Sequence, residues 1–120
     1  MQKPLTNIKE FLKRFNNFKD GEFRSIEIIS PITIIITLAG QDEARGFDWI
    51  SMKLELNGIN DARLIDNTKL SLIDMSDGVS IVNTENRSIF AIGKYNTISN
   101  IKNSSCFIDS STIKYEEGLF

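Results

Sequence analysis

Two pairs of aspartates have the spacing of residues that could bind a cation or act as acid and base. Asp74 and Asp77 precede Gly78, and Asp61 and Asp66 flank a short, mainly apolar stretch. Carboxylates bind hard cations, and two carboxyl groups in different environments can share acid–base work. The remaining ligands of an EF-hand-like loop are missing around Asp74, so a hairpin turn explains that pair. Solvated strand ends explain the other pair.

The residue types on which most catalytic and metal sites depend are absent or single. The chain has no histidine, which excludes triads with an imidazole base and zinc sites built on histidine. Cys106 is the only cysteine, so an intramolecular disulfide is impossible, and we expect a buried apolar role for it. Neither glycine-rich phosphate-binding motif occurs. We therefore expect no enzyme, no metal and no cofactor.

The acidic residues are concentrated in the middle third of the chain. The net charge is only −2, but residues 41–80 hold eight acidic and four basic side chains. The eight are Asp42, Glu43, Asp48, Glu55, Asp61, Asp66, Asp74 and Asp77. A clustered acidic surface speeds the encounter with a basic partner. The same residues also suit a soluble surface without any partner.

The elements that must position these residues begin with a helix. Apolar residues recur at three- and four-residue steps from Leu5 to Phe15, which predicts an amphipathic helix. Asn7 followed by Glu10 resembles a capping box, and Gly21 ends the pattern. We expect the aromatic side of this helix to pack against a sheet.

The rest of the chain alternates like strands. In the segment 48–56, Ile50, Met52 and Leu54 alternate with polar residues, and Asn57-Gly58 supplies a tight turn. We expect 40–47 to be a mobile loop and the tail 116–120 to be frayed. Strand character is expected at 105–108 and 112–115, which could form one strand bent near Ser110-Ser111. The other expected strands are 22–29, 32–39, 62–65, 69–74, 79–83 and 88–92.

Together these segments predict an α+β, mainly β single domain over residues 1–120. It would comprise an N-terminal helix plus about eight antiparallel strands, in two packed sheets or a barrel-like arrangement. The longest nearly apolar run, 32–39, is too short to span a bilayer, and charged residues interrupt the N-terminal apolar stretch. We expect a cytoplasmic protein without membrane contact.

Three segments resemble a family. FKDGEFRSIEI (18–28), LELNGINDARL (54–64) and LIDMSDGVSI (72–81) are similar to bacterial immunity proteins of contact-dependent growth inhibition systems that neutralise EndoU-type ribonuclease toxins. The resemblance implies a fold like that of the Whirly nucleic-acid-binding proteins, with antiparallel sheets and a helix. It implies a cognate nuclease domain as partner. The lysine-rich strand motif of Whirly proteins has no match here, which argues against nucleic acid.

The first hypothesis is therefore an immunity protein that blocks substrate access to a nuclease toxin. A nuclease cleft must be cationic to hold phosphates, so surface carboxylates on a rigid scaffold could occupy it. Arg and Trp are frequent hot spots, which adds two candidate anchors, although a core position is the other interpretation of Trp49. The candidate contacts are Asp42, Glu43, Asp48, Asp61, Asp66, Asp74 and Asp77, with Arg45 and Trp49 as anchors.

The alternative hypothesis is a Whirly-like β domain that binds a single-stranded nucleic acid or a small ligand. Its contact surface would consist of basic residues on the helix and two elsewhere, although helix lysines are usually just solvated. These residues are Lys9, Lys13, Arg14, Arg24 and Lys102.

Overall fold

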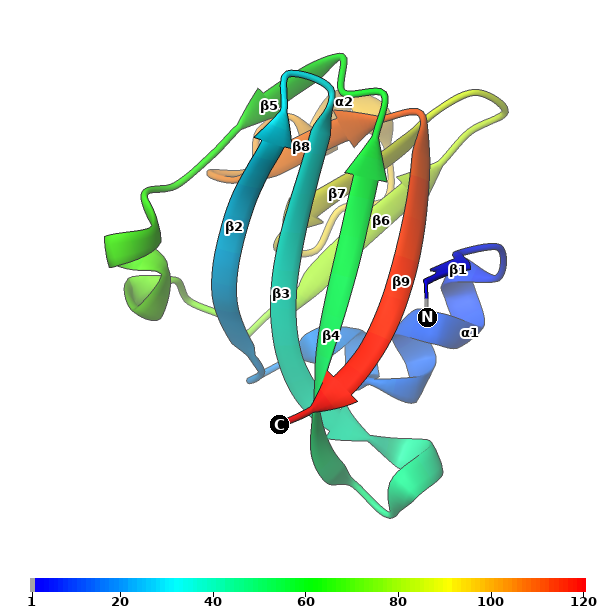
Figure 1. Cartoon of the computed structure of the whole chain (residues 1–120), viewed down its shortest axis with the longest axis vertical. Coiled ribbons are helices and arrows are strands. Elements are labelled where there is room, and N and C mark those ends of the chain that lie inside the picture. Colours follow the sequence, from blue (N-terminus) through cyan, green and yellow to red (C-terminus); the bar gives the residue numbers. More distant parts are fainter. Residues whose placement is uncertain (1) are drawn as a thin grey trace.

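The computed structural model describes residues 2–120 and contains a large antiparallel sheet with five strands (Figure 1). Its strand order is β1-β9-β4-β3-β2. The strands are β1 (Lys3–Pro4), β2 (Glu22–Ser30), β3 (Thr33–Asp42), β4 (Asp48–Asn57) and β9 (Thr112–Leu119).

A second antiparallel sheet of four strands lies behind the first in Figure 1. Its order is β5-β8-β7-β6, with β5 (Asp61–Arg63), β6 (Val79–Asn83), β7 (Ser88–Ile92) and β8 (Phe107–Ser110). The predicted α+β, mainly β class with two packed sheets is confirmed, with nine strands in place of about eight. The barrel-like alternative is wrong, because the described residues form two separate sheets, each with two free edges.

Short helices connect and cover the strands. They are α1 (Ile8–Arg14), η1 (Asn16–Phe18), η2 (Glu43–Arg45), η3 (Asn67–Leu72) and α2 (Ile98–Ile101). The predicted helix start is confirmed, since the Asn7 side chain accepts a hydrogen bond from the backbone N–H of Glu10 at 3.2 Å, as an N-cap residue does. No helix in residues 2–120 has the length and apolar character needed to cross a membrane.

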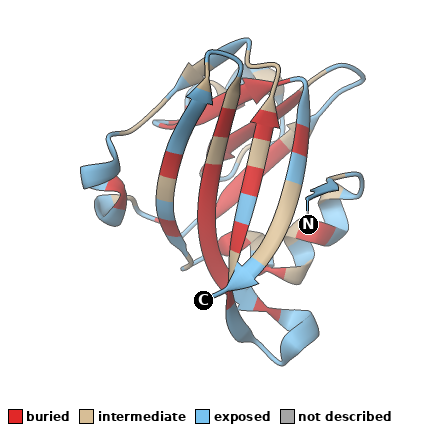
Figure 2. Ribbon diagram, viewed as in Figure 1, coloured by how far each residue is buried: buried red, intermediate tan, exposed pale blue. Residues whose placement is uncertain are grey.

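Alternation of side chains builds the core between the sheets. Ile50, Met52, Leu54 and Leu56 of β4 are all buried, as their period of two predicts, and Figure 2 shows buried and less buried residues alternating along this strand. The aromatic side of α1 and η1 joins the same core, as expected. Gly58 takes a φ of 70° in the predicted turn after β4, a conformation that glycine adopts readily.

Two segments differ from the prediction because a side-chain cap or pairing with a distant strand overrides the local sequence pattern. Residues 69–72 of the expected strand 69–74 belong instead to the 3₁₀ helix η3, whose first turn is capped by Asp66. The tail is not frayed: β9 runs to Leu119 and pairs with β4, where Glu116 lies opposite Lys53. Opposite charges on facing strand positions stabilise such a pair.

The bounds or connections of two further segments differ from the prediction. The segments 105–108 and 112–115 lie in two strands, β8 and β9, rather than in one bent strand, because the chain passes from one sheet to the other at Ser111. The N–H of Ser111 bonds to the carbonyl oxygens of Asn57 and Gly58. The loop predicted at 40–47 is shorter than expected. β3 continues to Asp42, and η2 follows it.

Candidate functional site

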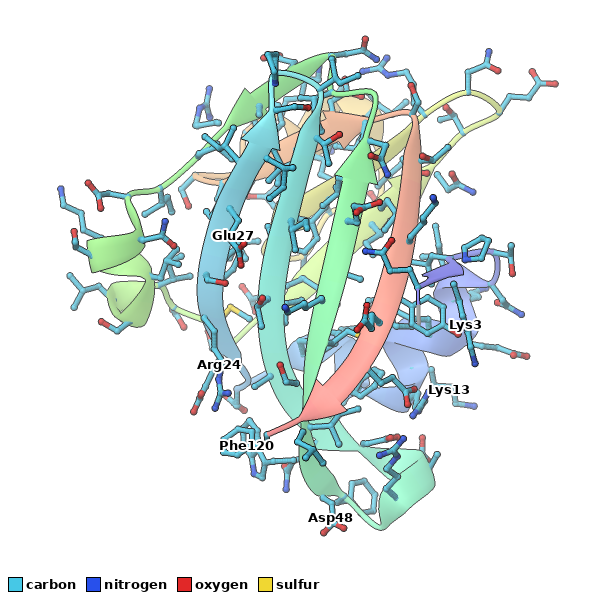
Figure 3. All side chains as sticks on the ribbon, in the orientation of Figure 1. Lys3, Lys13, Arg24, Glu27, Asp48 and Phe120 are labelled. Atoms are coloured by element: carbon cyan, nitrogen blue, oxygen red, sulfur yellow. The ribbon has the colours of Figure 1, made fainter. Side chains whose placement is uncertain are left out.

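The far end of the β3–β4 hairpin, residues 41–49, brings together five of the nine predicted contact residues. We refer to this segment as the hairpin end. Figure 3 shows Asp48 at its tip and Phe120 beside it. The five predicted residues are Asp42, Glu43, Arg45, Asp48 and Trp49.

Asp42 is not a surface contact, and this prediction is wrong. Its side chain is fully buried, and Arg14 of α1 donates two hydrogen bonds to its carboxylate, at 2.7 and 2.6 Å. The backbone N–H of Ala44 donates a third at 2.9 Å, and Nε of Arg45 lies 3.3 Å from Oδ2. The hydrogen bonds from Arg14 lower the pKa of the Asp42 carboxyl, although burial acts in the opposite direction.

Glu117 of β9 completes the group, which we call the Asp42 cluster: Asp42, Arg14, Arg45 and Glu117. Glu117 lies 2.7 Å from Arg14 and 2.7 Å from Arg45 through its two carboxylate oxygens. Two carboxylates and two guanidinium groups from α1, β3, η2 and β9 thus neutralise one another. Because charged hydrogen bonds join all four elements, the cluster holds the hairpin end against the rest of the molecule.

Two aromatic side chains are exposed on the hairpin end. Phe47 is 61% exposed and Trp49 is 37% exposed. The ring of Trp49 lies 5.4 Å from that of Phe120, and the guanidinium of Arg24 lies 4.1 Å above Phe120, within the range of a cation–π contact. Trp49 is therefore accessible at the edge of a small aromatic group.

Phe47 was missed because its segment was expected to be a mobile loop. Its φ is positive, at 66°, which is an uncommon conformation for a bulky residue. Its N–H donates to the carbonyl oxygen of Asp42 at 2.9 Å, and its own carbonyl accepts from the Gln41 amide at 3.3 Å. The signal that could have found it is a lone phenylalanine between Gly46 and Asp48, where nothing in the sequence offers it a place in the core.

A pocket of about 320 Å³ lies between the hairpin end and the α1–η1 segment. Phe47 and Trp49 line one part of it, and Lys13, Lys19 and Glu43 bring charges to it. Neither lysine forms an ion pair with a residue in the described part of the chain, whereas the nearby Arg14 is engaged in the Asp42 cluster. The pocket thus combines aromatic surface with mixed charge and an excess of cations.

The other four predicted contacts lie elsewhere. Asp61 begins β5, at the end of the molecule opposite the hairpin end in Figure 1, and pairs with Lys102 at 3.6 Å. Asp66 caps η3, and Asp74 accepts a hydrogen bond from the N–H of Ser76 at 2.9 Å. Asp77 lies in the turn before β6. The nine residues therefore do not form one acidic surface.

A second buried carboxylate was also missed from the sequence. Asp109 of β8 is 1% exposed and forms an ion pair with Arg87, while Nζ of Lys102 lies 3.3 Å from it. Burial acts to raise the pKa of Asp109, but the hydrogen bonds from these two cations outweigh it, and the pKa is lowered. This group ties the β6–β7 turn and β8 to the end of α2.

Several basic residues that the alternative, nucleic-acid-binding hypothesis requires are engaged in ion pairs. Arg14 belongs to the Asp42 cluster, and Lys102 pairs with the buried Asp109. Arg24 pairs with Glu22 at 3.0 Å, and its guanidinium lies over the ring of Phe120. Of the basic residues in that hypothesis, only Lys13 and the engaged Arg14 line the pocket at the hairpin end.

Metal-binding side chains and the Cys106 thiol are the groups in the described part of the chain that bear on chemistry. Within residues 2–120, no three metal-binding side chains of the His, Cys, Asp and Glu types lie close enough together to hold an ion. Burial raises the pKa of the Cys106 thiol to about 11, which keeps it protonated and a poor nucleophile at neutral pH.

Comparison with known proteins found no matching family model, no matching curated protein and no matching solved structure.

Proposed function

We propose that this protein is an immunity protein that binds a nuclease toxin domain through the hairpin end and blocks access of the substrate. The observation that carries the proposal is the exposed pair Phe47 and Trp49, held on a segment that the Asp42 cluster immobilises. The class of partner comes from the resemblance of the three sequence segments described above.

Aromatic side chains on an immobilised loop suit tight protein binding. Residues that dominate binding energy are enriched in large aromatic side chains, which bury much area at each contact. Ordering a loop on association costs free energy, and a loop that is already fixed avoids most of that cost. Because Phe47 and Trp49 have backbones fixed by strand pairing and hydrogen bonds, they enter an interface nearly preorganised.

The charges around Phe47 and Trp49 support a smaller electrostatic contribution to toxin binding than the sequence predicted. Glu43 and Asp48 are exposed at the hairpin end, and either can face a cationic nuclease cleft. Lys13 and Lys19 lie at the neighbouring pocket and limit the negative potential there. We therefore propose aromatic anchoring as the main source of affinity and the two carboxylates as an aid to association.

An inhibition assay of ribonuclease activity tests this proposal. An EndoU-type ribonuclease domain is assayed for cleavage of a fluorogenic RNA in the presence of increasing amounts of the protein. We expect stoichiometric inhibition by the natural chain and much weaker inhibition by the Trp49→Ala variant. Leu72→Ala is the matched control, since Leu72 is 80% exposed on η3, outside the hairpin end. Undiminished cleavage with excess natural protein would reject the proposal.

A second candidate function follows from the pocket itself. Aromatic rings beside unpaired cations form a stacking site for single-stranded nucleic acid, and Phe47, Trp49, Lys13 and Lys19 line one pocket. Such binding weakens steeply with salt. Binding of a labelled ten-nucleotide oligouridylate at low salt, lost at high salt and in a Lys13→Ala/Lys19→Ala variant, would favour this function over toxin binding.

A further inference from the structure

We propose that the free edge of β2 between Ile26 and Ser30 is a docking site for an extended segment of a partner protein. The segment would carry aliphatic side chains at alternate positions and a lysine or arginine next to them. This site is separate from the hairpin end, and the inference does not depend on the proposed function.

Hydrogen bonds at the outer edge of β2 show which way its backbone groups point. β2 is the last strand of the five-stranded sheet. At Ile26, the side-chain amide of Asn67 accepts from the backbone N–H at 2.9 Å and donates to the carbonyl oxygen at 2.9 Å. These are the two hydrogen bonds that one residue of a neighbouring strand would form. The Asn67 side chain therefore takes the place of one residue of a neighbouring strand. Its position shows on which side of β2 the backbone N–H and C=O groups of Ile26 point.

The next residue that faces outward has no such partner. Backbone groups of an edge strand point alternately toward the sheet and away from it, so Ile28 faces outward like Ile26. Beyond the β2–β3 ladder, no described residue forms a backbone or side-chain hydrogen bond with Ile28. The edge is thus capped at one position and open at the following one.

The side chains at this edge are apolar and exposed. Ile28 is 66% exposed, Ile29 57% and Ile32 60%. Figure 2 shows the upper half of β2 as mainly exposed. Proteins normally protect an edge of this kind with lysines, prolines or a covering element. Here Glu27 is the only charged residue between Ser25 and the turn at Pro31.

A groove of about 290 Å³ runs beside the open edge. Its lining is mostly aliphatic and comprises Ile26, Ile28, Leu64, Ile65, Asp66 and Asn67. A strand added to β2 would place every second side chain on the groove side. The shape and the lining therefore select an extended segment with aliphatic residues at alternate positions.

The charges favour a basic residue in that segment. Asp66 lines the groove, and no lysine or arginine does. Glu27 is exposed, projects from β2 (Figure 3) and forms no ion pair with a residue in the described range. Glu27 and the groove lie on opposite faces of β2. A lysine or arginine of the partner on the outer face would meet Glu27, and one on the groove face would meet Asp66.

A second copy of this chain is a poorer fit than a separate segment. In a symmetric antiparallel pair centred on Ile28, Ile26 of one copy would face Ser30 of the other. The outward groups of Ile26 already bond to Asn67, which begins η3. A short separate segment can pair at Ile28, end before the Asn67 side chain, and bring no second η3 helix to the edge.

The test uses the whole protein and the fluorescein-labelled peptide KVTVTVK, with KVTPTVK as control because proline removes one strand hydrogen bond. We expect fluorescence polarisation to show saturable binding of the first peptide and at least about tenfold weaker binding of the second. In Glu27→Lys, affinity for KVTVTVK should fall about fivefold and affinity for EVTVTVE should rise, whereas Glu43→Lys at the hairpin end should change neither.

Amide chemical shifts locate the peptide. Changes confined to residues 26–30 and 64–67 support the proposal. Equal binding of both peptides, shift changes at the hairpin end instead, or no binding at about 1 mM peptide would overturn it. A stable dimer of the protein that Ile28→Lys dissociates would also overturn it, because the edge would then be occupied by a second copy.

Discussion

Arg14 and Asp42 form a bidentate ion pair in which two guanidinium nitrogens lie 2.7 and 2.6 Å from the two carboxylate oxygens. The pair joins the C-terminal turn of α1 to the end of β3, and the carboxylate is fully buried. Arg45 and Glu117 extend it into a network of four charges. This network fixes the segment that carries Phe47 and Trp49.

Replacing Asp42 should destabilise the protein. Asp42→Asn removes a charge from a buried ion pair and leaves the guanidinium groups partly uncompensated, which costs about 3–5 kcal/mol for a fully buried pair. Because Arg14 is about a quarter exposed, we expect about 2–3 kcal/mol of lost unfolding free energy in urea titrations. Asp48→Asn is the control and should stay within about 0.5 kcal/mol. Equal losses in the two variants would show that the cluster is not structural.

Acid should weaken the fold through Asp42 and Asp109. Hydrogen bonds from Arg14 lower the pKa of Asp42, and those from Arg87 and Lys102 lower the pKa of Asp109 despite its burial. A carboxyl whose pKa is lower in the folded state contributes stability above its unfolded pKa of about 3.9, and this contribution is lost as the pH falls through the folded pKa.

The measurement is the unfolding free energy at several pH values below about pH 5. The natural chain should lose stability as the pH falls, and the Asp42→Asn/Asp109→Asn variant should be less stable at neutral pH but lose less on acidification. Parallel curves for the two proteins would mean that other groups cause the acid sensitivity.

Gly78 should tolerate no side chain. Its φ is positive, and an added Cβ would clash with the carbonyl oxygen of Asn17, so backbone strain and a steric overlap with backbone both oppose Gly78→Ala. We expect a loss of about 3 kcal/mol or more, or failure to fold. Gly46 also has a positive φ but open space around it, so Gly46→Ala should cost only about 1 kcal/mol in thermal or urea unfolding. Similar costs at both positions would contradict the packing of the Gly78 turn against η1.

The sequence was sufficient to predict features with a local signal. The alternation in β4, the turn at Gly58 and the Asn7 cap each depend on a few neighbouring residues, and all three are confirmed. The pairing of β9 with β4 and the crossing between sheets at Ser111 depend on distant segments. Nothing in the local pattern of those residues indicates which strand they meet.

The candidate site was predictable only in part for the same reason. Glu43, Asp48 and Trp49 are accessible at one end of the molecule, as a contact site requires. Asp42 is buried because Arg14, far away in the sequence, folds over it, and spacing alone cannot indicate that contact. Phe47 was missed because its backbone is fixed by tertiary hydrogen bonds rather than by a regular local pattern.

If Phe47 and Trp49 anchor a partner protein, calorimetric titration with an EndoU-type ribonuclease domain measures their contribution most directly. Each alanine variant, Phe47→Ala and Trp49→Ala, should weaken binding by at least about tenfold, because a hot-spot residue contributes more than about 1.4 kcal/mol. Since both side chains are exposed, their unfolding free energies should stay within about 1 kcal/mol of the natural protein. Unchanged affinity in both variants, or no binding by the natural protein, would contradict the account.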